Sequence, residues 1–316
     1  MRSYQTFWFV FTLLIFENSC KKKEEEIQIP DEFKEFNYSI SNLSIANEFQ
    51  LHSNDTLKNP LLEEASGLAV SSTNPTIFWS HNDSGWPNWL FPVPSNGENY
   101  GHIPLSGAGA RDWEDICIGP GTKEGVNYLY VGDIGDNQLQ YNFIVIYRIP
   151  EPDVSNLSTI SSISFDINDL ERFEFEYPDE LVNAESLMID PWSKNLYIIS
   201  KSGFRSIIYE AQAPFDQTKR TKLKKVAQFP FTGAVAADIS RDGKHIAIKT
   251  LSNIYYWNRN VGESLLHAFA KQPRLLPYIQ EPQGESFGWT PDASGYFTLS
   301  EKKNNQKPII YYYKKL

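Results

Sequence analysis

The sequence predicts an all-β chain folded as a β-propeller, in which four-stranded antiparallel blades surround a central channel. The first observation is a repeat, because an apolar strand begins at Glu64, Glu114, Glu185, Val235 and Glu285, in steps of 50, 71, 50 and 50 residues. The second is that each copy continues through a turn into a second apolar run, as in a hairpin. The third is that further β-rich runs follow each hairpin. A period of this size with four strands per unit is typical of propeller blades.

The strands of each copy follow one order. The first strands are EASGLAV, EDICIG, ESLMIDP, VAADISRDG and ESFGWTPD. The turns SSTNP, GPGTKEG, DPWSKN, SRDGKH and TPDASG accompany the second strands TIFWSHND, NYLYVGD, LYIISK, IAIKT and YFTLSE. The third strands, rich in aromatic and β-branched residues, are NWLFPV, FIVIYRI, SIIYEA, IYYWN and IIYYY. Weaker fourth runs follow in four copies: YGHIPL, RFEFEY, KVAQFP and LLHAF.

The last copy lacks a fourth strand, because the sequence ends shortly after IIYYY. A run within FNYSISNLSIANEFQLH can supply it, so that N- and C-terminal strands close the ring. Five blades then use every strand once, and five is the preferred number. Six blades are the alternative, since the 71-residue step also holds the segment NLSTISSISFDINDL. A single propeller domain is expected over residues 36–316.

The first 35 residues read as an export signal and a tether. The apolar run from Phe7 to Phe16 is too short to span a bilayer, so residues 1–19 are expected to be a signal peptide. Cys20 follows Ser19 as in the lipobox of bacterial lipoproteins, although Glu17 stands where that motif has Leu. We therefore expect Cys20 to carry lipid and the charged residues 20–35 to tether an exported protein to the membrane of the bacterial cell envelope. A plain secreted protein is the alternative.

Charge and cysteine content exclude other classes. The formal net charge is −10, which argues against a nucleic-acid partner, for which a basic stripe would be expected. With Cys20 lipidated, Cys117 has no partner, and its apolar strand predicts a buried small side chain rather than a reactive thiol. A disulfide scaffold is excluded, so stability must come from the core. A monomer is expected.

One rim of the channel is expected to collect polar side chains. If the first strand of each blade lines the channel, the acids that open these strands all enter at the same end. The second strand runs back antiparallel, so its last residues return to that rim. The predicted ligand face, for a small molecule or a protein, consists of Glu64, Asn82, Asp83, Glu114, Asp115, Lys201, Lys249, Gln283, Glu285 and Glu301. Lys201 and Lys249 either neutralise the acids or hold an anionic ligand.

The segment GDIGDN is the strongest candidate for metal chemistry. Its two glycines let the backbone bend sharply and bring Asp133, Asp136 and Asn137 together. Oxygen-only clusters suit Ca²⁺ or Mg²⁺ rather than zinc. With the acids of the same rim, the candidate ligands of a Ca²⁺ ion are Asp83, Glu114, Asp133, Asp136, Asn137 and Glu185. The alternative is that the Asp and Asn residues only form a tight turn after the strand.

Several motifs, taken in order, resemble one family of proteins. EASGL, HNDSG, DWEDI, VGDIGDN, AESL, IAIKT and EPQGE are similar to a widespread bacterial family of secreted or lipid-anchored propellers of mostly unassigned function. The resemblance covers roughly Leu61 to Glu301. More distantly the chain is similar to the NHL, SMP-30/gluconolactonase and phytase-like propellers, some of which are calcium-dependent hydrolases. After Asn137, family members often continue with Arg, whereas this chain has Gln138, which weakens the inference of an anionic ligand there.

Two classes of function remain. In the first, the chain is a surface-tethered binding or scaffold propeller whose cation orders the rim. In the second, it is a metal-dependent hydrolase of phosphoesters or lactones, with Asp83 or Glu185 as general base and His81, the one histidine expected at the rim, as a further candidate. Ser286 matches a G-x-S-x-G motif but opens a strand rather than a strand–turn–helix elbow. No trio of base, nucleophile and electrophile can be assembled, so the binding class is favoured.

Overall fold

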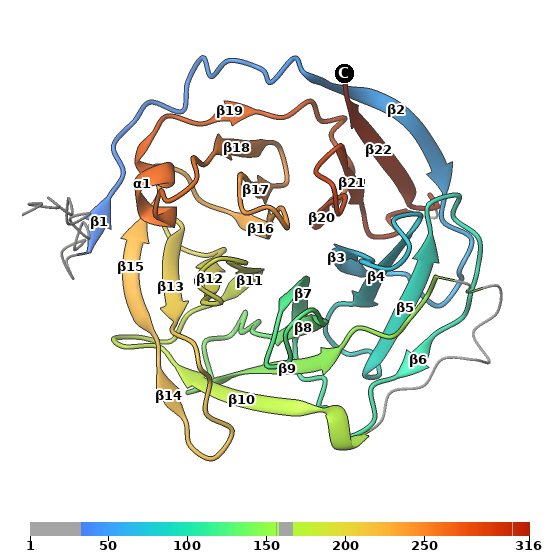
Figure 1. Cartoon of the computed structure of the whole chain (residues 1–316), viewed down its shortest axis with the longest axis horizontal. Helices are drawn as coiled ribbons and strands as arrows, with labels where there is room; N and C mark the ends of the chain where they lie inside the picture. Colours follow the sequence, from blue (N-terminus) through green and yellow to red (C-terminus); the bar gives the residue numbers. More distant parts are fainter. Residues whose placement is uncertain (1–32, 156, 158–166, 305) are drawn as a thin grey trace, which may run out of the picture. The chain divides into compact units, whose positions relative to one another are not determined.

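Five β-sheets surround a common axis in the unit formed by Phe33–Leu316, each sheet set like a blade around the channel (Figure 1). The computed structural model describes residues 33–155, 157, 167–304 and 306–316. The predicted signal peptide, Cys20 and most of the predicted tether lie outside the described residues. No helix in the described part of the chain has the length and hydropathy of a membrane span. The predicted five-bladed propeller is confirmed, and the six-bladed alternative is wrong.

The first two blades contain the strands that the sequence predicts. Blade 1 consists of β3 (Ala65–Val70), β4 (Ile77–Asn82), β5 (Trp89–Pro94) and β6 (Ile103–Pro104). Blade 2 consists of β7 (Trp113–Pro120), β8 (Asn127–Asp133), β9 (Ile144–Pro150) and β10 (Glu171–Glu176), with the short helix η2 (Ile167–Asp169) ahead of β10. A fifth strand, β14 (Thr221–Lys222), pairs parallel to β10 at its edge.

The other three blades complete the ring. Blade 3 consists of β11 (Ala184–Ile189), β12 (Leu196–Ser200), β13 (Ile207–Ala211) and β15 (Lys224–Gln228). Blade 4 consists of β16 (Ala234–Ile239), β17 (His245–Thr250), β18 (Ile254–Asn258) and β19 (Arg274–Leu275). Blade 5 consists of β20 (Ser286–Trp289), β21 (Gly295–Leu299), β22 (Ile309–Lys315) and β2 (Phe49–Thr56).

The N-terminal part of the described chain wraps the outside of the ring before closing it. β1 (Lys34–Glu35) pairs parallel to β15 at the edge of blade 3, so strand pairing extends the propeller into the last two residues of the predicted tether. The chain then follows blade 4, where the backbone of Ala46 bonds to that of Leu275. β2 finally pairs antiparallel with β22, which is the predicted closure by N- and C-terminal strands, although the strand begins only at Phe49.

The predicted fourth strand LLHAF is wrong, because this segment forms the helix α1 (Leu265–Ala270). Ser264 caps the helix by accepting the backbone N–H of His267. Leu265, Ala268 and Phe269 are buried, the i, i+3, i+4 spacing of one helix face. A short apolar run does not distinguish this pattern from a strand, and the fourth strand of blade 4 is the later Arg274–Leu275.

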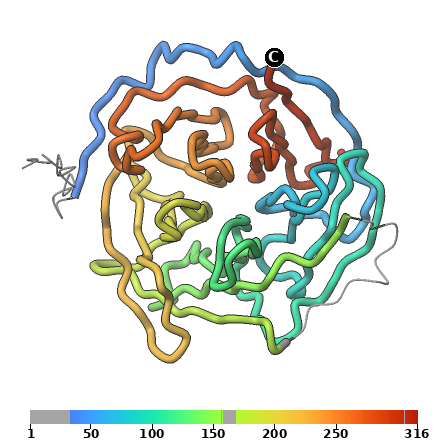
Figure 2. Tube along the Cα trace, in the orientation of Figure 1, coloured from blue at the N-terminus to red at the C-terminus, as the bar shows by residue number. Residues whose placement is uncertain are grey.

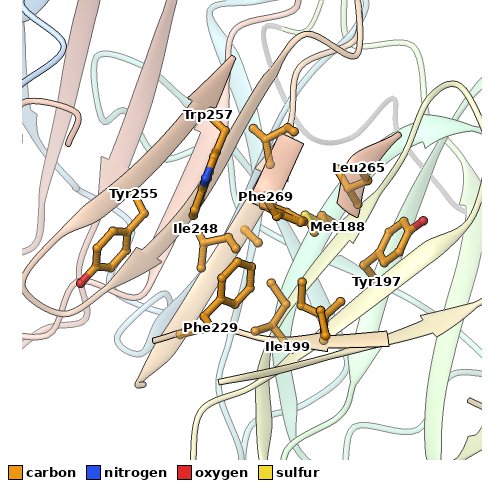
Figure 3. Close-up of a cluster of buried hydrophobic side chains, with 14 of the residues drawn as sticks. Met188, Tyr197, Ile199, Phe229, Ile248, Tyr255, Trp257, Leu265 and Phe269 are labelled. Atoms are coloured by element: carbon orange, nitrogen blue, oxygen red, sulfur yellow. The ribbon is translucent and has the colours of Figure 1, made fainter. Parts of the chain in front are cut away.

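The first strand of each blade is the innermost, as the Cα trace shows (Figure 2). β3, β7, β11, β16 and β20 are almost entirely buried, because neighbouring blades cover both of their faces. Between blades 3 and 4, Met188, Ile248 and Trp257 belong to a cluster that α1 closes through Phe269 (Figure 3). Trp113 packs in the same way between blades 1 and 2, and Cys117 is buried as predicted.

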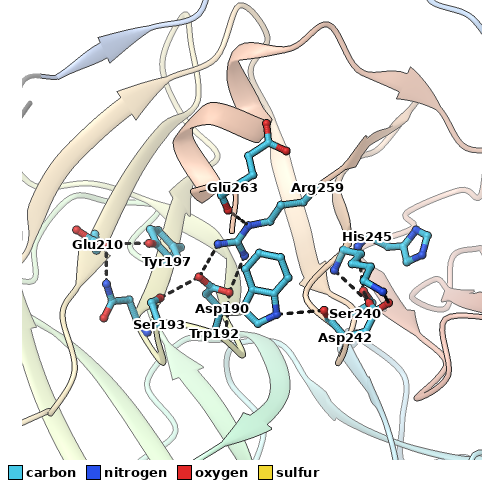
Figure 4. Close-up of polar contacts among 12 residues, drawn as sticks. Asp190, Trp192, Ser193, Tyr197, Glu210, Ser240, Asp242, His245, Arg259 and Glu263 are labelled. Atoms are coloured by element: carbon cyan, nitrogen blue, oxygen red, sulfur yellow. Dashed lines mark hydrogen bonds and ion pairs between the residues drawn. The ribbon is translucent and has the colours of Figure 1, made fainter. Parts of the chain in front are cut away.

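Charged side chains also join blades 3 and 4, at the rim where the first strands end (Figure 4). Arg259 follows β18 and reaches Asp190, which follows β11, through two hydrogen bonds of 2.7 and 3.1 Å. The Arg259 guanidinium stacks on the ring of Trp192 at 3.9 Å, and the Trp192 indole N–H donates to the backbone of Asp242. The buried Arg259–Asp190 pair thus ties the two blades together at the rim opposite the predicted ligand face, and the exposed Trp192 covers it.

Candidate functional site

Strand register brings the predicted acids to one end of the channel. Ala65 pairs with Asn82, Trp113 with Asp133 and Ala184 with Ser200, so the start of each first strand faces the end of the second. Six carboxylates and one ammonium group gather there, and we call this set the acidic mouth: Asp83, Asp112, Glu114, Glu185, Lys201, Glu285 and Glu301. The strand ends on which the predicted rim depends therefore lie at the same end of the channel.

Two triplets of carboxylates form the centre of the mouth. Oxygens of Asp83, Asp112 and Glu114 all lie within 4.8 Å of one another. Oxygens of Asp83, Glu285 and Glu301 satisfy the same limit. Asp83 belongs to both triplets and is half-buried, whereas the other four side chains are buried. The acids thus converge from blades 1, 2 and 5 on the residue that follows β4.

Glu114 and Asp112 each have one carboxylate oxygen without a hydrogen-bond donor among the described residues. Glu114 is 1% exposed, and its Oε1 has no hydrogen-bond partner among the described residues. Asp112 Oδ1 is also buried without a partner in the described chain. Both carboxylates press against Gly135, where a Cβ atom would overlap Glu114 Oε1 and the carboxylate of Asp112. A buried charge without a partner is costly, so this arrangement favours a bound cation or a proton.

β-bulges orient the side chains of two of the acids toward the mouth. The pairing of β7 with β8 shifts between Trp113 and Asp115, which leaves Glu114 as the bulged residue. Glu185 is the bulged residue of β11 in blade 3. A bulge re-aims the extra side chain, here toward the channel opening. In blade 4 the same position is the apolar Val235, which explains why that blade adds no carboxylate to the mouth.

Lys201 is the one ammonium group of the acidic mouth as defined above. Its Nζ contacts the carboxylate of Glu185 and lies 3.4 Å from Glu285 Oε1. Burial opposes the charge of Lys201, but these two carboxylates outweigh burial and raise its pKa. The structure thus places Lys201 as a neutralising group beside the second triplet, one of the two roles considered for it.

Asp83, Glu185 and Glu301 hold their protons more strongly than free side chains do. Burial raises the pKa of Asp83 to about 6, and repulsion from Asp112 and Glu285 adds to the shift. Burial raises the pKa of Glu185 to about 7, although Lys201 opposes it. Burial and the nearby Glu285 carboxylate raise the pKa of Glu301 to about 8. These shifts indicate negative charge that one lysine does not balance.

The segment GDIGDN supplies no carboxylate to the two triplets, although the sequence predicts that it binds the metal ion. Asp133 accepts the backbone N–H of Asp112 at 2.8 Å and lies 3.7 Å from Arg111. Asp136 accepts the backbone N–H groups of Gln140 and Tyr141, both at 2.8 Å, which is the tight turn considered as the alternative. Asn137 is exposed and bonded to the side chain of Asn183. These three residues support the mouth from outside the two triplets.

Three residues predicted at the rim make buried contacts outside the two carboxylate triplets. His81 lies against Trp113, its Nδ1 pairs with the Asn82 carbonyl at 2.9 Å, and burial lowers its pKa to about 4, so it is no base at the rim. Lys249 is wholly buried, contacts the Gly284 carbonyl and pairs with Glu281 at 3.7 Å.

Asp115 is the third of these buried residues. Its Oδ2 accepts the backbone N–H groups of Leu187 and Ala237, so it joins blades 2, 3 and 4. The alternation of strand residues could not reveal this, because the bulge turns Asp115 inward beside Glu114.

The remaining predicted residues border the mouth. Glu64 is half-buried and accepts the indole N–H of Trp86 at 2.8 Å. The Asn82 side chain accepts the backbone N–H of Glu64 and donates to the Leu61 carbonyl, so it fixes the loop. The Gln283 backbone accepts the N–H of Glu301. Sequence reasoning missed Asp112 as a candidate ligand, although its place two residues before Glu114 was a usable signal.

Comparisons with known proteins concern the fold alone. No protein-family model matches the chain, and no curated protein matches it. Among solved structures, the Dos1 propeller is 12% identical over 79% of this chain and 68% of its own, with a TM-score of 0.37. The Pan2 WD40 domain of Neurospora crassa is 8% identical over 84% of this chain and 95% of its own, with a TM-score of 0.41. The strand pairing itself identifies the chain as a five-bladed β-propeller.

Proposed function

We propose that this chain is an extracytoplasmic, lipid-anchored binding protein whose acidic mouth holds Ca²⁺ and uses it to present a surface for a ligand or a protein. The export signal and Cys20 support the location, and the β-propeller is a fold that commonly serves as a binding module. The observation that carries the proposal is the pair of carboxylate triplets that share Asp83.

The ligand chemistry favours a hard divalent cation. Each triplet offers carboxylate oxygens only, which suit Ca²⁺ or Mg²⁺ and not the softer transition metals. The unpartnered Oε1 of Glu114 supplies an oxygen that nothing in the described chain satisfies. Ca²⁺ is the better fit, because it accepts irregular sets of six to eight oxygens whereas Mg²⁺ demands a near-ideal octahedron.

Charge balance suggests two cation positions. When all six carboxylates of the mouth are ionised, Lys201 compensates one of them and five charges remain. Two divalent cations, one in each triplet with Asp83 between them, would compensate four. Each triplet provides only three side chains, so water or groups of a bound partner would complete the coordination. An open position of this kind would let the cation take part in ligand binding.

A binding role is preferred to the hydrolase alternative. His81 is buried away from the mouth, and Glu185 is paired with Lys201, so two of the three candidate bases are engaged. Asp83 would be a cation ligand in both triplets, and that role occupies its oxygens. Lys201, the one amine of the acidic mouth, is ion-paired with Glu185 and Glu285.

The test is calorimetric titration of Ca²⁺ into the protein and its Asp83→Asn variant. Asp83→Asn should remove binding at both triplets, whereas Asp112→Asn and Glu301→Gln should each impair one. Glu124→Gln is the matched control, since Glu124 is exposed in the turn at the opposite end of blade 2. Wild-type protein that takes up no Ca²⁺, or Asp83→Asn protein that binds like wild type, would refute the proposal.

A further inference from the structure

A cavity lies at the opposite end of the ring from the acidic mouth. Its volume is about 490 Å³, and it is lined by outer strand β2, by turns of blade 1 and by blade 5. It therefore lies between blades 1 and 5, next to β2, the strand that closes the ring. A cavity of this size is in the range of small-molecule sites.

The walls of this cavity are rich in polar groups that are not charged. Six serine and threonine side chains line it, together with the amide of Asn96 and the hydroxyl-bearing ring of Tyr312. Ser53 follows a register shift in β2, a bulge that sets its direction. These groups come from five separate segments and converge on one space.

The charged residues of the cavity exclude anionic ligands and metal ions. No lysine, arginine or histidine lines it, so nothing there would neutralise a phosphate or a carboxylate. Asp55 and Asp292 are its two acids, and neither belongs to a cluster that could hold a metal ion among the described residues. Asp292 already accepts the hydroxyl groups of Thr290 and Ser294 through its Oδ1. The carboxylate of Asp55 is a strong hydrogen-bond acceptor for hydroxyl groups of a ligand.

The apolar part of the lining is aromatic and rigid. The rings of Phe297 and Tyr312 stack with centroids 4.6 Å apart, and His52 packs edge-on against Tyr312 at 5.6 Å. A Cβ on Gly295 would come within 3.0 Å of the Tyr312 hydroxyl, so this ring lies tightly across the start of β21. The cavity therefore combines a fixed aromatic surface with many hydroxyl and carboxylate groups.

We propose that this cavity binds a neutral carbohydrate of one or two rings. A sugar ring presents an apolar face, which suits the partly exposed ring of Tyr312 held by the buried Phe297, and an edge of hydroxyl groups, which suits Asp55, Asn96 and the serines. The site uses no group of the acidic mouth. Binding there does not depend on a cation, which separates this proposal from the preceding one.

The experiment titrates methyl glycosides into the full chain. The panel contains neutral hexosides, N-acetylhexosaminides, one hexuronide and adenosine, each up to about 10 mM, and saturation-transfer NMR and calorimetry report binding. Ser53→Trp fills the cavity from β2. Asn54→Trp is the matched control, because the next residue of a strand points to the other face and Asn54 does not line the cavity.

The expected result is binding of a neutral glycoside that Ser53→Trp weakens at least tenfold, that Asn54→Trp leaves unchanged and that EDTA does not affect. A second variant, Asp55→Asn, should weaken binding without adding bulk. Absence of glycoside binding, preference for the hexuronide or for adenosine, or binding that survives Ser53→Trp would each overturn the proposal.

Discussion

Glu114 in blade 2 and Glu185 in blade 3 occupy the same bulged position of their first strands, yet only Glu185 has a cationic partner. The bulge aims both carboxylates at the mouth of the channel. Lys201 contacts Glu185, whereas Oε1 of Glu114 has no partner among the described residues. Equivalent positions therefore differ in their electrostatic surroundings, and this difference can be measured.

Amide substitutions at these two positions should have opposite effects on the cation-free protein. Glu114→Gln removes an uncompensated buried charge and should raise the free energy of unfolding by about 1 kcal/mol. Glu185→Gln deprives Lys201 of its closest partner and should lower it by about 1 kcal/mol, a modest cost because Lys201 is partly exposed and keeps Glu285. Urea unfolding in EDTA measures both. Equal effects of the same sign would contradict this account of the mouth.

In Ca²⁺ the wild-type protein should become more stable than the Glu114→Gln variant. An ion that binds only the folded state adds about 2.7 kcal/mol at a hundredfold excess over its dissociation constant. Wild-type protein should gain this stabilisation, and Glu114→Gln should lose most of it. Melting temperatures with Ca²⁺ and with EDTA provide the measurement, with Glu124→Gln as the variant that behaves like wild type.

Gly135 should be intolerant of a side chain, because two carboxylates of the mouth occupy the space beside it. Gly135→Ala would place its methyl group against Glu114 and Asp112, which must then move apart. We expect a loss of about 1–3 kcal/mol in stability and weaker Ca²⁺ binding. Gly132→Ala is the matched control, since its methyl group would meet Ile134 and Leu187 at 3.3 Å. If both variants bind Ca²⁺ as wild type does, Gly135 has no part in shaping the mouth.

Stability should depend on pH through Asp238 in blade 4. This buried carboxylate accepts the backbone N–H of Trp289 in blade 5 at 2.9 Å, and burial raises its pKa to about 7. The folded state therefore binds more protons than the unfolded state between about pH 4 and pH 7. The contribution of Asp238 is present below that window and is lost as the pH rises through it.

Asp238→Asn keeps the hydrogen-bond acceptor and should flatten this part of the profile. Urea unfolding at a series of pH values in EDTA compares the two proteins. A wild-type stability that rises between pH 4 and pH 7 by an amount that Asp238→Asn removes would show the opposite sign and contradict the assignment.

The Arg259–Asp190 pair should stabilise the fold without affecting Ca²⁺ binding at the acidic mouth. Both groups are buried, and Arg259→Met would leave Asp190 without its cation. Breaking a buried pair from one side costs about 3–5 kcal/mol. Urea unfolding should show this loss while Ca²⁺ stoichiometry stays unchanged. A cost below about 1 kcal/mol would mean that water replaces the guanidinium without penalty.

The lipid anchor is tested by Cys20→Ser in the full chain. The variant should move from the membrane fraction to the soluble fraction, because no second anchoring signal is expected in the leader or tether. Unchanged fractionation would exclude lipidation of Cys20 as the means of attachment.

The repeat predicted the fold because its spacing is set by whole strands and turns. The rim followed from the same argument, since antiparallel hairpins return their ends to one side. The helix at Leu265 was missed because a six-residue apolar run fits both periods. The ligands were only partly predicted, because the bulge in β7 decides whether Glu114 or Asp115 faces the channel, and the bulge in β11 does the same for Glu185.

The central claim is most directly tested by a crystal structure of the protein soaked in Ca²⁺. The account predicts an ion bound by Asp83, Asp112 and Glu114 and another by Asp83, Glu285 and Glu301, at Ca–O distances of about 2.3–2.6 Å. A mouth that stays free of ions at saturating Ca²⁺, or an ion bound instead by Asp133, Asp136 and Asn137, would contradict it.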